Sequence, residues 1–145
     1  MTSPLTNDTS IEEIVENFSF LEDWDDRYGY LIELGRMLSP LDEKQMIDEN
    51  KVQGCVSQVW VVSSVEERNG TNILHFQGAS DAHIVSGLVA IALCLFSGKP
   101  ADEIIALDEQ SVFAEIGLKE HLTPQRSNGL RSLVQRLKAI ASAAN

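Results

Sequence analysis

The stretch from Ser57 to Gln77, SQVWVVSSVEERNGTNILHFQ, decides the fold of this chain, because two strand-forming runs flank one tight turn. In the first run, valines alternate onto one face and a tryptophan and a further valine onto the other, which is typical of a strand partly buried on both faces. Asn69-Gly70 is the strongest short signal for a two-residue hairpin turn. The stretch therefore predicts an antiparallel β-hairpin.

Helical patterns lie on both sides of this hairpin. Ser10 to Glu13 has the spacing of a capping box and predicts a first helix, and an apolar stripe predicts a second from Leu21 to Leu38. The most apolar run, Ile84 to Phe96, is shorter than the roughly 20 residues that span a bilayer, so it is interpreted as a buried helix. Thr123-Pro124 is typical of the start of a last helix. This order of helices and strands predicts an α+β fold in which helices cover a small antiparallel sheet. The sheet consists of the hairpin, which a third strand could extend.

Length and charge limit the domain organisation and the partners. With 145 residues, 43% of them hydrophobic, the chain is expected to form one domain over residues 1–145, with residues 1–9 flexible. The formal charge of −11 would repel nucleic acid and anionic membrane surfaces. A protein partner or a small ligand fits this charge better.

The start of the chain lacks the basic and apolar regions of a signal peptide, so a cytoplasmic location is expected. The two cysteines, Cys55 and Cys94, should then be reduced and unpaired. Cys94 lies in the most apolar helix and is expected to fill the core. Cys55 follows Gly54 directly and precedes the strand. It is either a small core residue or a thiol presented on a loop, where unpaired backbone N–H groups could lower its pKa.

Several kinds of chemistry can involve a thiol such as Cys55. No CxxC motif or histidine spacing indicates a metal site, and two cysteines are too few for an iron–sulfur cluster. A cysteine hydrolase would need a histidine base, for which His121 is a weak candidate without a sequence signature. No glycine-rich phosphate loop is present. Thiol exchange needs only one accessible sulfur of low pKa, so this chemistry remains a hypothesis for Cys55.

Four segments resemble the SufE-like sulfur acceptors, which are partners of cysteine desulfurases. They are Gly54 to Trp60 (GCVSQVW), Trp24 to Gly35, Ser80 to Leu88 (SDAHIVSGL) and His121 to Leu130 (HLTPQRSNGL). Their order and spacing agree with the family from about Phe18 to Leu137.

The resemblance implies a fold shared with the U-type iron–sulfur scaffold proteins. It also implies that Cys55 takes sulfur from the persulfide of a pyridoxal-phosphate cysteine desulfurase, stimulates that enzyme and passes the sulfur to an iron–sulfur scaffold complex. The chain would bind no cofactor or metal of its own and would act as a carrier, not as a stand-alone enzyme. A homodimer is plausible by the same resemblance.

By position in the matching segments, the resemblance implies a role in partner docking or in support of the loop for Gly54, Ser57, Asp81 and Arg126. Asp81 could instead cap the apolar helix, as could Ser80, and Arg126 could be a surface residue of the last helix. We expect the loop to cover Cys55 at rest and to swing outward on docking. The competing hypotheses are a cysteine-dependent hydrolase or redox enzyme that uses His121, and an adaptor in which the cysteine is incidental.

Overall fold

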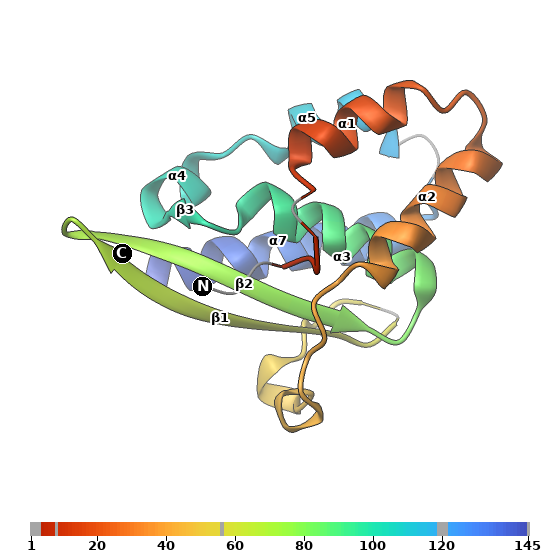
Figure 1. The fold of residues 1–145 in the computed structure, drawn as a ribbon. Coiled ribbons are helices and arrows are strands. Elements are labelled where there is room, and N and C mark those ends of the chain that lie inside the picture. The colour runs from red at the N-terminus through yellow and green to blue at the C-terminus, as the bar shows by residue number, and fades with distance from the viewer. Residues whose placement is uncertain (1–3, 8, 56, 119–121, 145) are drawn as a thin grey trace.

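The computed structural model describes residues 4–7, 9–55, 57–118 and 122–144. Its sheet has the order β1-β2-β3, and both neighbouring pairs are antiparallel. Helices gather along the hairpin, with α1 and α5 farthest from it in the view of Figure 1. The described elements, in chain order, are α1 (Ile11–Ser19), α2 (Trp24–Arg36), η1 (Glu43–Gln45), η2 (Asp48–Asn50), β1 (Val59–Arg68), β2 (Thr71–Ser80), α3 (His83–Phe96), β3 (Lys99–Pro100), α4 (Ala101–Ala106), α5 (Glu109–Ile116) and α7 (Pro124–Ala144). The predicted α+β class and antiparallel sheet are confirmed.

The hairpin forms as the turn chemistry predicts. Asn69 and Gly70 both have positive φ angles, 53° and 80°, as a tight turn of this kind requires. The two strands pair along their whole length, from Arg68 and Thr71 at the turn to Val59 and Ser80 at the open end. Each strand therefore extends beyond the apolar part of its sequence. A short third strand, β3, pairs with Ile73 and Leu74.

Capping explains where several of the helices begin. Ser10 accepts a hydrogen bond from the backbone of Glu13, as the capping box predicts. The second helix is shorter than expected, because Asp23 caps it and the chain leaves the helix after Arg36. The prediction that Ser80 or Asp81 caps the apolar helix is wrong. The N-cap of α3 is Ala82, which makes no side-chain cap bond.

The core forms where α3 packs between α2 and the hairpin. Nine residues of α3 are buried, which confirms its interpretation as an internal helix. The crossing with α2 is close: a Cβ on Gly87 would lie 2.1 Å from the carbonyl oxygen of Leu31. Only glycine permits this approach of the two backbones.

The chain between Leu41 and Gly54, which has no helical or strand period, contains the two 3-10 turns η1 and η2. At the start of the chain, Leu5 is buried and bridges to Leu38, and Thr6 binds the carbonyl of Met37. No pattern in the sequence predicts these contacts. They place the start of the chain against the end of α2.

Candidate functional site

Cys55 lies on a short loop between η2 and β1. The loop is closed at its base by a 2.8 Å hydrogen bond from the backbone N–H of Val52 to the carbonyl of Val59. Lys51 and Trp60 form an isolated bridge beside it. We call the described residues 53–55, 57 and 58 the cysteine loop. Its ends are joined like the base of a hairpin, so the segment that carries the thiol is set apart from β1.

The backbone turns sharply at Gly54, where φ is +92°. Residues other than glycine rarely adopt this conformation. The site is also crowded, because a Cβ on Gly54 would lie 2.5 Å from the Ser132 hydroxyl oxygen on α7. Glycine at this position therefore has a structural cause, and the cause includes a helix far away in the sequence.

The thiol of Cys55 rests against α7. Its Sγ lies 3.5 Å from the carbonyl oxygen of Gly129, to which it can donate a weak hydrogen bond. Burial of the side chain raises the pKa of the Cys55 thiol above its ordinary value of 9.0. The sequence leaves a lowered pKa open for a thiol on a loop. In the position that the structure gives it, the thiol is instead kept neutral at pH 7.

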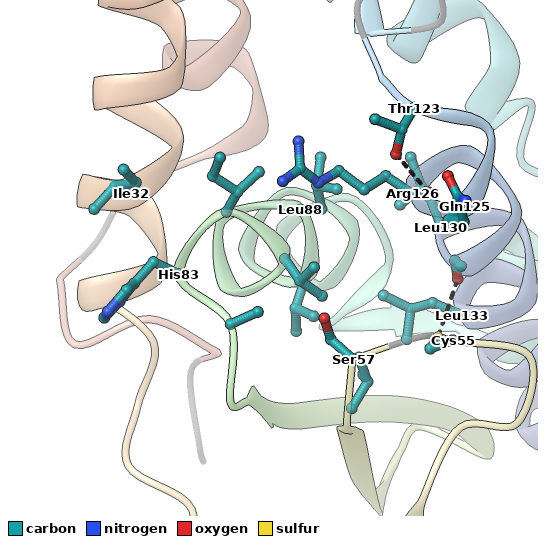
Figure 2. A pocket seen from close by; sticks show the side chains of 16 residues that line it. Ile32, Cys55, Ser57, His83, Leu88, Thr123, Gln125, Arg126, Leu130 and Leu133 are labelled. Carbon is teal, nitrogen blue, oxygen red and sulfur yellow. Dashed lines mark hydrogen bonds between the residues drawn. The ribbon is translucent and has the colours of Figure 1, made fainter.

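A cavity of about 630 Å³ opens beside Cys55. Its lining comes from α2, α3, α7, β1 and the cysteine loop, and most of it is apolar. Figure 2 shows Arg126 extending from α7 toward the middle of this cavity, with Cys55 on the α7 side. The apolar lining residues are Ile32, Val59, Ile84, Val85, Leu88, Val89, Leu130 and Leu133. The space is far larger than one sulfur atom requires.

Five residues were predicted for the site, and the structure brings three of them together at one cavity. Cys55, Ser57 and Arg126 line the same cavity, and Gly54 adjoins it. Asp81 does not line the cavity. Its two carboxylate oxygens accept hydrogen bonds from Gln58, one from the backbone N–H at 3.0 Å and one from the side-chain amide at 3.3 Å. Asp81 therefore supports the end of the cysteine loop.

Arg126 lies in the first turn of α7, which has the predicted cap at Thr123. Its backbone N–H donates to the hydroxyl of Thr123 at 3.2 Å, which confirms the cap expected at Thr123-Pro124. Within the part of the chain that the structure describes, its guanidinium has no carboxylate partner. The positive charge thus faces a largely apolar cavity.

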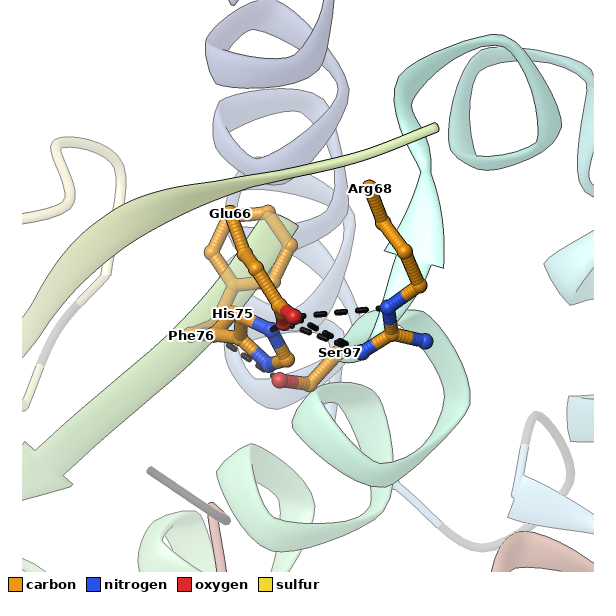
Figure 3. A network of polar contacts seen from close by, with 5 residues as sticks. All are labelled: Glu66, Arg68, His75, Phe76 and Ser97. Atoms are coloured by element: carbon orange, nitrogen blue, oxygen red, sulfur yellow. Dashed lines mark hydrogen bonds and ion pairs between the residues drawn. The ribbon is translucent and has the colours of Figure 1, made fainter. Parts of the chain in front are cut away.

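The histidines do not form a catalytic pair with Cys55 in the described ranges. His121, the base considered for a hydrolase, lies outside the described residues. His83 also lines the cavity, but on the side away from Cys55 (Figure 2). His75 lies on the hairpin, where its Nε2 contacts Glu66 at 2.8 Å (Figure 3). This contact, with the one from Arg68, lowers the pKa of Glu66 and ties β1 to β2.

Sequence reasoning missed three residues of α7 that contact the cysteine loop or its upstream end: Gly129, Ser132 and Arg136. Their spacing of three and four residues marks one face of a helix. No feature of the sequence says that this face meets the loop, because the segments are more than 70 residues apart.

Two further observations limit the class of site. Among the described residues, no group of three or more histidine, cysteine, aspartate or glutamate side chains could hold a metal ion. In the same residues, no helix combines the length and the apolar character needed to cross a membrane. The site is therefore defined by one thiol, an apolar cavity and a nearby cation.

Comparisons with known proteins show the family of the chain. Residues 12–141 match the family model described as "SufE: Fe-S metabolism associated domain". The chain belongs to the SufE family, and its role lies in iron–sulfur metabolism. The predicted family is confirmed.

Two relatives support this assignment. The chain is 54% identical to an uncharacterised SufE-like protein of Rhizobium etli, over 89% of this chain and 87% of the relative. It is 52% identical to an uncharacterised SufE-like protein of Rhizobium meliloti, over 92% of this chain and 95% of the relative. A solution structure of a hypothetical protein from Thermus thermophilus has the same fold, with a TM-score of 0.71 at 20% identity, and the match covers 92% of this chain and 94% of that one.

Proposed function

We propose that this chain is a sulfur acceptor and carrier that takes sulfur onto Cys55 from the persulfide of a cysteine desulfurase. The observation that carries the proposal is the position of Cys55: a thiol on a loop with a closed base, beside an apolar cavity that an arginine also lines. The family and its place in iron–sulfur metabolism agree with this activity. The downstream acceptor would be an iron–sulfur scaffold complex.

The transfer is a thiol exchange. The thiolate of Cys55 attacks the terminal sulfur of the desulfurase persulfide, and the sulfur–sulfur bond of that persulfide breaks. The desulfurase cysteine leaves as a thiolate and takes up the proton that Cys55 lost. The sulfur atom moves with its oxidation state unchanged, so the step needs no external oxidant or reductant.

The proposed function requires two positions of the loop. In the position that the structure shows, the raised pKa keeps Cys55 neutral and poorly nucleophilic, and the thiol is partly shielded against α7. Transfer then requires the loop to move outward. Cys55 follows Val52 by three residues, so an extended loop could carry it roughly 10 Å from the closed base.

The remaining predicted residues fit supporting roles. The guanidinium of Arg126 would favour a persulfide anion in the cavity or a carboxylate of the docked partner. Asp81, through Gln58, would fix one end of the moving segment. Gly54 would supply the turn, and Ser57 would line the path of the thiol.

The decisive experiment is mass spectrometry after incubation with a cysteine desulfurase and free cysteine. One added sulfur atom should map to Cys55, and the Cys94→Ser variant should gain it equally. The Cys55→Ser variant should bind the desulfurase without stimulating it. If Cys55→Ser stimulates the enzyme fully, the chain is an adaptor. If Cys55 gains no sulfur in the wild type, the carrier proposal is wrong.

The outward movement has its own test. Amide exchange across Lys51 to Ser57 should become faster when the desulfurase is added. Unchanged exchange would contradict the movement while leaving the acceptor role intact. We further propose that residues 1–145 form one domain and that the protein is cytoplasmic. We also propose that it forms a homodimer, and sedimentation equilibrium would test this oligomeric state.

A further inference from the structure

Arg136 binds the chain on the other side of the cysteine loop from Asp81. Its Nη2 donates to the carbonyl of Glu49 at 2.8 Å, and its Nη1 donates to the carbonyl of Lys51 at 3.3 Å. Both carbonyls lie at the end of η2, just before the loop begins. The side chain therefore joins α7 to the upstream end of the loop across more than 80 residues of sequence.

The contacts of α7 follow the loop in order. Gly129 contacts Cys55, Ser132 lies against Gly54, and Arg136 holds Lys51. Residues three and four apart lie on one face of a helix, so these three residues form one continuous stripe. We call this stripe the loop seat. It supports the loop from Cys55 back to its upstream end.

We propose that Arg136 is a positioning residue that holds the upstream end of the cysteine loop and thereby controls how readily Cys55 leaves its cavity. The inference rests on the proposed function, in which Cys55 is the reactive group. Asp81 holds the downstream end through Gln58, so the loop is fixed at both ends. A guanidinium suits this position because its planar fork can bind two carbonyls at once.

A charged donor also strengthens both hydrogen bonds relative to a neutral one. Removing it frees the upstream end at Lys51 without touching the thiol or the cavity. The closed position of the loop should then be less favoured. Lysine keeps the charge but cannot bind both carbonyls as the guanidinium does. Arg136→Lys should therefore hold the closed position of the loop only in part.

The test measures the alkylation rate of each cysteine by iodoacetamide in the complete chain. Arg136→Ala should raise the rate at Cys55 roughly 3- to 10-fold. Arg136→Lys should give an intermediate rate. The matched control is Arg131→Ala, an exposed arginine of the same helix, which should leave the rate as in the wild type. Cys94 serves as an internal control for the fold, and its rate should stay unchanged in all variants.

An unchanged Cys55 rate in Arg136→Ala would overturn the proposal. An equal rise at Cys55 and Cys94 would also overturn it, because it would indicate general loosening; if that variant folds poorly, the same comparison in Arg136→Lys decides. The assay contains no desulfurase, so its outcome is independent of whether Cys55 accepts sulfur. A failed sulfur transfer with a normal Arg136 effect would therefore reject only the proposed function.

Discussion

Asp81 holds Gln58 with both of its carboxylate oxygens, accepting the backbone N–H at 3.0 Å and the side-chain amide at 3.3 Å. The two residues are 23 positions apart, one just before β1 and the other just after β2. The hairpin brings them together, since Val59 pairs with Ser80 next to them. The carboxylate thus fixes the chain where the cysteine loop joins the sheet.

Replacing Asp81 with alanine should loosen this end of the loop. The amide of Gln58 loses its acceptor, and the closed position should lose about 1 kcal/mol, because both groups are exposed and water replaces part of the interaction. Amide exchange at Gln58 should become roughly fivefold faster in Asp81→Ala. Exchange at Leu74, in the middle of β2, is the control and should not change. Equal exchange at Gln58 in both proteins would contradict this role.

Gly54→Ala should disfavour the closed loop by about 1–3 kcal/mol, because alanine is strained at φ +92° and its Cβ would meet the Ser132 hydroxyl. The result should be faster alkylation of Cys55 at an unchanged rate for Cys94. Adding Ser132→Ala removes the hydroxyl and should recover part of the loss, while the backbone strain remains. A double variant no better than Gly54→Ala alone would show that contact with Ser132 contributes nothing.

Two helical glycines should respond in opposite directions. Gly87→Ala places a Cβ 2.1 Å from the Leu31 carbonyl oxygen and should cost about 3 kcal/mol or more, since backbone must move. Gly29→Ala meets open space in the middle of α2 and should stabilise the protein by about 0.5–1 kcal/mol. Urea denaturation measures both. A Gly87→Ala variant as stable as the wild type would contradict the close crossing of α2 and α3, and a Gly29→Ala variant less stable than the wild type would contradict the open space at Gly29.

Cys94 should make stability depend on alkaline pH. Burial raises the pKa of its thiol to about 12 from the ordinary 9.0. The folded protein therefore keeps this proton between pH 9 and 12, whereas the unfolded chain loses it. The stability due to the neutral thiol is complete below about pH 9 and falls as the pH rises toward about 12.

The measurement compares wild type with Cys94→Ala by urea denaturation under reducing conditions. Between about pH 8 and about pH 10.5, the wild type should lose on the order of 1 kcal/mol more than the variant. The comparison isolates the thiol of Cys94 together with its effect on Tyr30, whose pKa it helps to raise. Parallel loss of stability in the two proteins would show that the thiol of Cys94 is accessible to water.

Local patterns predicted most of the fold. The Asn69-Gly70 turn, the capping box at Ser10 and the Thr123-Pro124 start each depend on a few adjacent residues, and each element formed where they indicate. Where local signals competed, the prediction failed. Asp81 has a side chain that could cap α3, but the pairing of β1 with β2 brings Gln58 close, and Asp81 accepts hydrogen bonds from Gln58 instead.

The sequence alone also favoured Cys55 over Cys94 as the candidate thiol, because its glycine and polar neighbours left a loop position open, and the family resemblance then gave Cys55 the role of sulfur acceptor. Only the tertiary structure decided what surrounds that loop. The loop seat of Gly129, Ser132 and Arg136, and the cavity that Arg126 faces, arise from packing between segments far apart in the chain. Helical spacing defines a face of α7 but not its neighbour. That neighbour is set by how α3, the hairpin and α7 bury their apolar surfaces together, and no local pattern contains this information.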